Sequence, residues 1–400
     1  MKSIIIKFFL CLLFSQIYLY SQSNINPKIS AIGTFNTFTN FIKDTPEYGK
    51  LNFETPELEM FIDGYLNPYS LATANFAFEE GAFALEELYA EVVRGLPLDI
   101  QLKAGKYLLG FGKLNTVHPH AWAFIERPLM NQVFLGEEGF NDIGFNISFI
   151  LPLEEVYTTF DIGVYKGDAI GNTISGHHHG EEGEPEVENT RGINPMVIGR
   201  LSSFFSLSDF SHLETGINGA YGVLAKENVV KTISPAVNTS EETLYFLYGD
   251  FDFKYKYKPD SYTSLTVQGE GLLNLRDVPV TGETEQGEII TSLRSITTFG
   301  AFIYFDYQFL KQFSVGAKYD FTYGIIGDEP EYNTLGNDDE NKTHGISGWV
   351  GFYPVEETLA LRLGIQHLIF EYANDIKRDP ETTLTLQLLF SLGPHKAHQF

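Results

Sequence analysis

A long alternation of apolar and polar residues is the feature of this sequence that most restricts its fold. In the stretch "TLYFLYGDFDFKYKYK", residues 243–258, one alternating set is apolar and rich in aromatics, and the other set carries charge. Successive side chains of a β-strand point to opposite faces, so a period of two predicts a strand with one apolar and one polar face. The charged members of its polar face are Asp250, Asp252, Lys254 and Lys256.

The same alternation recurs in "SITTFGAFIYFDY", "QFSVGAKYDFTYG" and "LALRLGIQ". These strands extend over about 10 to 15 residues, whereas strands of globular proteins are usually about 5 to 6 residues long. Long strands with one apolar face and one charged, glycine-rich face are typical of a closed barrel with lipid outside and water inside. Further charges predicted to face the interior are Arg294, Asp306, Lys318, Asp320 and Arg362.

The joints between the predicted strands alternate between short and long. Strands are expected to begin near residues 28, 57, 69, 83, 97, 141, 155, 195, 210, 243, 260, 293, 311, 344, 357 and 380. Long joints are expected at 39–56, 108–140, 166–194, 224–242, 273–292 and 324–343. Short periplasmic turns opposite long extracellular loops are typical of outer-membrane barrels. We therefore predict an all-β, transmembrane antiparallel barrel of about 16 strands (14 to 18), with a two-domain soluble β protein as the alternative.

The start of the chain indicates export. Lys2 and Lys7 flank the beginning of the apolar run "IIIKFFLCLLF", as in a secretory signal. We predict a signal peptide at 1–21 and one barrel domain at 22–400, located in the outer membrane of a Gram-negative cell. The lone Cys11 lies within the predicted signal, so disulfide and thiolate chemistry are excluded from the barrel. A net charge of -25 makes nucleic acid a poor partner.

The strand pattern and the final residue, Phe400, resemble Gram-negative outer-membrane porins, whose barrels commonly end in an aromatic residue read by the barrel-assembly machinery. A narrower similarity rests on "LKAGKYLLGFGKLNTVHPHAWAFIERPLMNQVFLGEEGFNDIGFNISFILP" (residues 102–152), on a histidine-rich loop and on the ending "GPHKAHQF". These stretches are similar to a poorly characterised group of barrels labelled zinc-regulated outer-membrane receptors. About six residues separate the predicted signal from the first strand, so no plug domain is expected there and a passive pore is favoured.

The histidine-rich loop, "SGHHHGEEGEPEVEN", is the first candidate metal site. Imidazole and carboxylate groups are good ligands for zinc and similar cations. Two interpretations stay open, weak capture of a divalent cation and a solvated acidic loop at the cell surface. The candidate ligands are His177, His178, His179, Glu181 and Glu182.

The segment 108–140 is the second candidate site. The third long loop of general porins folds into the lumen, and this resemblance implies the same here. His118 and His120, two apart in an extended chain, point the same way and could share a ligand. A loop that simply packs against the barrel wall is equally compatible with the sequence. The residues expected at the constriction are His118, His120, Glu126, Arg127, Glu137 and Glu138.

The predicted function is passive diffusion of small hydrophilic solutes, with a cation preference and a link to divalent metal uptake, zinc in particular. No nucleophile and base signature is recognisable, so we expect no enzyme activity. No cofactor is required, although zinc or another divalent cation could bind loosely. Expected partners are outer-membrane lipid, the assembly machinery, small solutes or cations, and further copies of the chain in a homotrimer. The alternative is a non-conducting surface barrel that acts in adhesion or metal capture.

Overall fold

The structure is a computed structural model that describes residues 27–43, 45–79, 82–136, 139–154, 156–169, 195–232, 238–283, 289–324, 341–355, 358–372 and 377–393. For residues 79, 224–232, 238–242, 278–283 and 289–294 it describes the backbone alone. Several predictions therefore fall outside the described residues. They concern the signal peptide at 1–21 and the side chains of His177, His178, His179, Glu181, Glu182, Glu137, Glu138 and Phe400.

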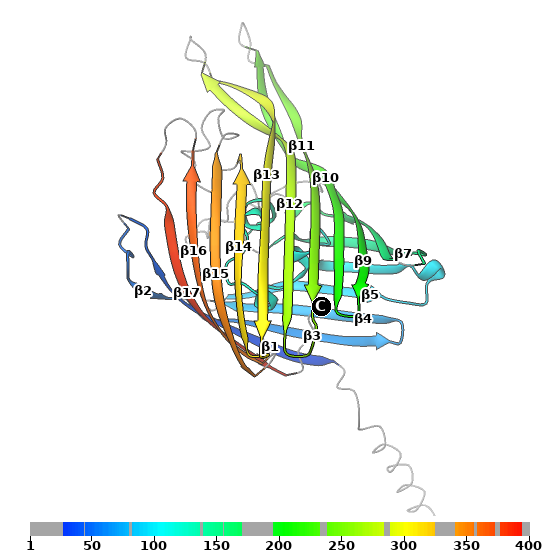
Figure 1. The fold of residues 1–400 in the computed structure, drawn as a ribbon. Coiled ribbons are helices and arrows are strands. Elements are labelled where there is room, and N and C mark those ends of the chain that lie inside the picture. Colours follow the sequence, from blue (N-terminus) through cyan, green and yellow to red (C-terminus); the bar gives the residue numbers. More distant parts are fainter. Residues whose placement is uncertain are drawn as a thin grey trace, which may run out of the picture.

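The chain forms one antiparallel sheet that closes on itself (Figure 1). Neighbouring strands pair in sequence order, and β1 completes the ring by pairing with both β3 and β17. A three-residue strand, β2 (Leu51–Phe53), adds to the edge of β1. The prediction of a barrel of about 16 strands is confirmed. The ring consists of β1 (Lys28–Asn40), β3 (Glu57–Asn67), β4 (Ser70–Glu79), β5 (Ala82–Val92), β6 (Gln101–Leu108), β7 (Asn141–Leu151), β8 (Tyr157–Tyr165), β9 (Met196–Ser208), β10 (Ser211–Thr232), β11 (Asn238–Tyr257), β12 (Ser264–Glu283), β13 (Ile289–Phe309), β14 (Phe313–Tyr323), β15 (Lys342–Val355), β16 (Leu359–Glu371) and β17 (Glu381–Leu392).

The predicted alternation of faces is present in the barrel wall. In β11, Phe251 is 51% exposed on the outside, whereas the next residue, Asp252, is 1% exposed on the inside. Burial alternates in the same way along β14. Apolar side chains thus cover the outer surface, and most charged side chains of these strands face inward.

Two pairs of strands are longer than the sequence indicates. The segments 224–242 and 273–292, expected as long loops, are mostly strand, because β10 pairs with β11 up to Thr232 and Asn238, and β12 pairs with β13 up to Glu283 and Ile289. These two hairpins rise above the rest of the ring (Figure 1). The loop prediction was wrong here because it was based on the polar side chains of these segments. The hydrogen bonds between paired strands join backbone groups, so polar side chains do not prevent pairing.

Helical elements are short and few in the described part of the chain. They comprise the 3-10 segments η2 (Pro97–Asp99), η3 (Leu114–Thr116) and η4 (Pro119–Ala121) and the α-helix α2 (Leu129–Leu135). Three of these four, η3, η4 and α2, belong to the connection between β6 and β7.

No helix among the described residues has the length and apolar character needed to cross a membrane.

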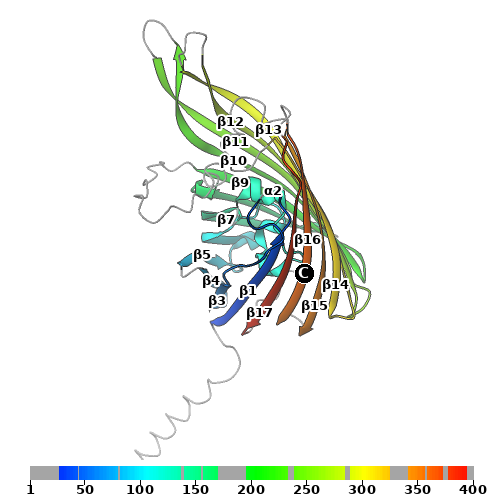
Figure 2. The same ribbon diagram turned by 90° about the vertical axis from the view of Figure 1, so that its left-hand side faces the viewer.

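The connection between β6 and β7, residues 109–140, lies inside the ring of strands, and we call it the inner loop (Figure 2). Its aromatic and aliphatic side chains form a core with residues on the inner face of the wall. Phe124, for example, packs against Tyr304 and Trp349, at ring-centroid distances of 5.0 and 5.8 Å. This core also explains why β11 carries Phe246 and Tyr248 on its otherwise polar face.

Truncation of Phe124 should release the inner loop. Phe124 is 1% exposed, and removal of a buried Phe side chain costs about 3–5 kcal/mol. We expect Phe124→Ala to accelerate proteolytic cleavage within residues 109–140 by at least about tenfold, measured by mass spectrometry of timed digests. Phe305→Ala is the matched control, because Phe305 is 44% exposed on the outer surface. Equal cleavage rates in the two variants would contradict docking through this core.

Candidate functional site

The inner loop is attached to the wall at β14 and β17. The backbone N–H of Leu129 donates to Asp320 Oδ1 at 3.2 Å, and Lys318 Nζ donates to the carbonyl oxygen of Glu126 at 2.9 Å. Thr385 donates its hydroxyl to Glu126 Oε1, also at 2.9 Å. Burial raises the pKa of Glu126, with Thr385 and Lys318 acting in the opposite direction. Lys318 and Asp320, two of the charges expected to face the interior, thus lie on the inner face and are covered by the loop.

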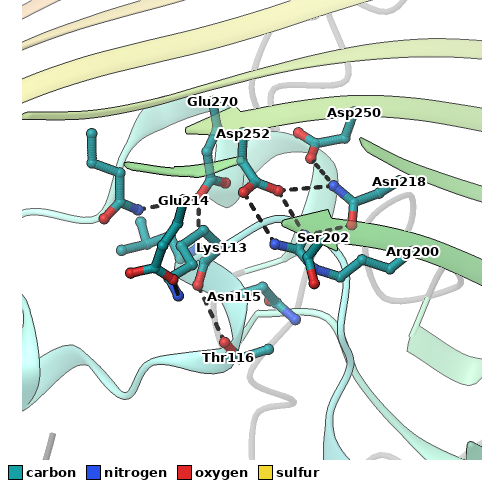
Figure 3. A network of polar contacts seen from close by, with 12 residues as sticks. Lys113, Asn115, Thr116, Arg200, Ser202, Glu214, Asn218, Asp250, Asp252 and Glu270 are labelled. Carbon is teal, nitrogen blue, oxygen red and sulfur yellow. Dashed lines mark hydrogen bonds and ion pairs between the residues drawn. The ribbon is translucent and has the colours of Figure 1, made fainter. Parts of the chain in front are cut away.

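A second polar network lies on the inner face of β9 to β11 (Figure 3). Arg200 and Asp252 form a paired contact, with nitrogen to oxygen distances of 2.6 and 3.1 Å. Asn218 donates to Asp250 at 2.5 Å and to Asp252 at 3.0 Å. The two aspartates were expected from the alternation of β11, whereas the guanidinium that balances them comes from β9.

The inner loop contacts this network through Glu270 of β12. The backbone N–H of Leu114 donates to Glu270 Oε1 at 2.5 Å, and Lys113 forms an ion pair with Glu214 of β10 (Figure 3). Asp250 Oδ2 and Glu270 Oε2 are buried with no hydrogen-bond partner among the described residues. Three buried acidic side chains, Asp250, Asp252 and Glu270, thus lie around one guanidinium.

A polar cavity of about 420 Å³ lies between the inner loop and strands β5 to β10. Small polar side chains from β7 and β9 line part of it, including Asn146, Ser148 and Ser202. Its charged side chains are of both signs in equal number. The acidic ones are Glu91, Asp161 and Glu214, and the basic ones are Lys103, Lys113 and Arg200.

His118 of the inner loop lies among three carboxylates that come from β3 and β5. His118 Nε2 is 3.0 Å from Glu87 Oε2, and His118 Nδ1 is 3.4 Å from Glu59 Oε2 and 4.0 Å from Glu86 Oε2. His120 Nδ1 lies 3.2 Å from the other oxygen of Glu59. Burial lowers the pKa of His118, but the hydrogen bond to Glu87 and the nearby carboxylates outweigh burial and raise the pKa overall.

The two histidine rings are stacked at a centroid distance of 5.7 Å, in keeping with the expectation that His118 and His120 point the same way. Their partners Glu59 and Glu87 were not singled out from the sequence, although each occupies an inward position of its strand. A β-bulge between β4 and β5 brings Glu86 to the same side, and nothing in the sequence marks that bulge.

The remaining predicted residues are dispersed around the interior. Arg127 lies over the ring of Trp122 at 4.8 Å, and Asp306 accepts a hydrogen bond from Trp349 Nε1 at 2.9 Å. Arg362 donates to Gln387 at 3.3 Å. Lys254 and Lys256 are half-buried on β11, and the side chain of Arg294 of β13 lies outside the described part.

Removal of Arg200 should destabilise the barrel strongly, because it leaves Asp252 buried without its cation. Breaking a buried ion pair by removing one partner costs about 3–5 kcal/mol. We expect Arg200→Gln to lower the free energy of unfolding by an amount of this size, measured by urea titration in detergent, and Asp252→Asn to restore part of it. Lys43→Gln is the control, since the pair of Lys43 and Asp379 is exposed and should be worth about 0–1 kcal/mol. A loss in Arg200→Gln no larger than in the control would contradict this electrostatic interpretation.

Comparison with solved structures shows the fold. The chain is similar to OprB of Pseudomonas putida (TM-score 0.56, 8% identity, 92% of this chain and 94% of that one). It is also similar to the anion-selective porin from Comamonas acidovorans (TM-score 0.54, 10% identity, 91% and 98%). A third is the outer membrane channel DcaP of Acinetobacter baumannii (TM-score 0.53, 11% identity, 93% and 99%). The barrel thus has the fold of outer-membrane porins.

Comparison of sequences shows the relationship. No protein-family model matches the chain. Nothing in these comparisons supports the narrower similarity to zinc-regulated outer-membrane receptors. An uncharacterized protein of Aquifex aeolicus (strain VF5) is 30% identical over 363 residues, which make up 88% of this chain and 72% of that protein. At this identity and coverage, the chain belongs to the same protein family as the Aquifex aeolicus protein.

Proposed function

We propose that this protein is an outer-membrane porin through which small hydrophilic solutes diffuse passively. The observation that carries the proposal is the polar cavity of about 420 Å³ beside the inner loop, inside a closed barrel. The inner loop contacts the inner face of the wall at several places around the ring. The passage for solutes is therefore narrow, and it runs along β5 to β10. Such a passage admits small solutes and requires no catalytic group.

The outer surface supports placement in a lipid bilayer. Phe309, Phe313 and Phe352 form a series of stacked rings, with centroid distances of 5.7 and 5.3 Å, near the short-turn ends of β13 to β15. Tyr307 extends the series at 6.0 Å from Phe309. Aromatic girdles of this kind lie where the bilayer meets water. The short turns then face the periplasm and the long connections face the cell exterior.

The cation preference is proposed to arise at the mouth of the channel and not at the cavity. The cavity carries equal numbers of acidic and basic side chains, so it has little preference of its own. The chain as a whole carries a net charge of -25, and its predicted outer connections are acidic. Charges at an exposed mouth are screened by salt, with a screening length of about 10 Å at 0.1 M and about 3 Å at 1 M.

Planar-bilayer recording in a potassium chloride gradient tests conduction and selectivity together. We expect open channels with a clear cation preference when the dilute side is at 0.1 M salt, and a preference that falls toward none at 1 M. Swelling of liposomes in small sugars provides an independent readout of the open passage. Absence of current at all voltages, together with absence of swelling, would overturn the proposal and favour the non-conducting surface barrel.

A bulky side chain in the cavity should narrow the passage. Ser202 lines the cavity, whereas its neighbour Leu201 is 42% exposed on the outer face. We expect Ser202→Trp to lower single-channel conductance by about twofold or more, because conduction depends on pore diameter. Leu201→Trp places the same side chain on the same strand toward lipid and should leave conductance unchanged. Equal conductance of both variants and the wild type would show that the passage lies elsewhere.

The other predictions made from the sequence remain predictions. They are the signal peptide, recognition of Phe400 by the assembly machinery, the homotrimer, and a contribution of His177, His178 and His179 to divalent metal uptake.

A further inference from the structure

We propose that the cluster between the inner loop, β3 and β5 is a binding site for one divalent transition-metal ion, with Glu59, Glu86 and Nδ1 of His118 as its ligands. The site is distinct from the histidine-rich loop at 177–179. It goes beyond the proposed function and does not depend on conduction. One nitrogen and two carboxylate oxygens form a donor set that suits Zn²⁺ and similar ions.

The distances between the three donor atoms fit a single ion. One donor atom from each of Glu59, Glu86 and His118 lies within 4.8 Å of the others. His118 Nδ1 is 3.4 Å from the Glu59 oxygen and 4.0 Å from the Glu86 oxygen. Ligands bound to zinc at about 2.0–2.2 Å in a tetrahedral arrangement lie roughly 3.3–3.6 Å apart. The Glu86 carboxylate would move toward the other two donors when an ion binds.

Glu87 gives His118 the tautomer that metal binding needs. Its Oε2 lies 3.0 Å from His118 Nε2, and its Oε1 is held by the backbone N–H of Leu108 at 3.0 Å. When Nε2–H donates to Glu87, the lone pair of Nδ1 is directed at the carboxylates of Glu59 and Glu86. Three acceptors then face one another, and a cation between them removes the repulsion. A carboxylate that orients a histidine in this way is a recurrent feature of metal sites.

Asn75 provides an independent indication of a missing ligand. It is 0% exposed, and its Nδ2 lies 2.6 Å from Glu86 Oε2 and 3.5 Å from Glu59 Oε2. Its Oδ1 is buried with no hydrogen-bond partner in the described part of the chain. Most buried polar atoms of folded proteins have a hydrogen-bond partner. Rotation of the amide by half a turn would direct Oδ1 at the same carboxylates, an arrangement that a bound cation stabilises.

The pairing of β4 with β5 contains a β-bulge next to the cluster. Asn75 pairs with Glu87 and Phe76 pairs with Leu85, so Glu86 is an additional residue in β5. Adjacent residues of a regular strand point to opposite faces, but the bulge lets Glu86 and Glu87 both reach His118. The bulge thus supplies a ligand and the orienting carboxylate from neighbouring positions.

His120 holds the second oxygen of Glu59, at 3.2 Å, and acts as a positioning residue. The cluster contains three carboxylates and two imidazoles. A divalent ion offsets two of the three negative charges while the imidazoles stay neutral. In that state the metal connects the inner loop directly to β3 and β5.

Titration of Zn²⁺ into the purified, detergent-solubilised full chain tests the site. All variants carry His177, His178 and His179 replaced by Ala, so that the histidine-rich loop does not contribute. We expect this background protein to bind one Zn²⁺ by isothermal calorimetry. We expect His118→Gln and Glu86→Gln each to raise the Kd by at least about tenfold.

His367→Gln is the matched control, because His367 contacts Thr382 on the barrel wall away from the cluster, and its Kd should equal that of the background. Heat-modifiable mobility on gels establishes that each variant is folded, and if His118→Gln does not fold, Glu86→Gln decides. Binding of Co²⁺ with a visible absorption band that both variants abolish would support the ligand set. A background protein that binds no Zn²⁺, or binds it equally after both substitutions, would overturn the site and leave the cluster as an ion-pair anchor. Bilayer conductance, measured separately, stays informative about the channel in either case.

Discussion

Pairing of β1 with β17 closes the sheet into a ring. A sheet with free edges leaves backbone groups unpaired, whereas closure into a ring gives each strand of the wall a neighbour on both sides. Closure also separates an inside from an outside, so the alternation of β11 becomes a division between apolar and charged surfaces. The enclosed charges then need partners, and the inner loop supplies many of them. Leu114 donates to Glu270 on one side of the wall and Leu129 donates to Asp320 on another.

The parts of the fold that were predicted correctly are those determined locally. A period of two is visible within ten residues, so the positions of the long strands follow from segments such as 243–258. The extended hairpins of β10 to β13 were missed, because backbone pairing tolerates polar side chains. At the candidate site, His118 and His120 were identified by their spacing, whereas Glu59 and Glu86 lie far away in the sequence. Register and a bulge, neither of which is visible in a single sequence, bring them together.

The interior combines two kinds of attachment with different physical consequences. The aromatic core around Phe124 and Trp349 is tolerant of small rearrangements, since apolar contacts have little directionality. The charged contacts, such as Lys113 with Glu214, are directional and fix the position of the loop relative to individual strands. Buried ion pairs add little net stability but penalise alternative arrangements in which one partner is left uncompensated. The polar cavity therefore keeps a defined shape, because the loop that bounds it has few acceptable positions.

The contacts of the inner loop join parts of the chain that are far apart in the sequence. Leu129 is separated from Asp320 by 191 residues, and Glu126 is separated from Thr385 by 259 residues. Two of the strands that hold the loop, β14 and β17, thus follow it at a long distance in the chain, and β17 is also the strand that closes the ring. Once the ring is closed, a segment with η3, η4 and α2 cannot enter from the side. Attachment of the loop at Glu126 and closure of the ring therefore depend on the same strand, β17.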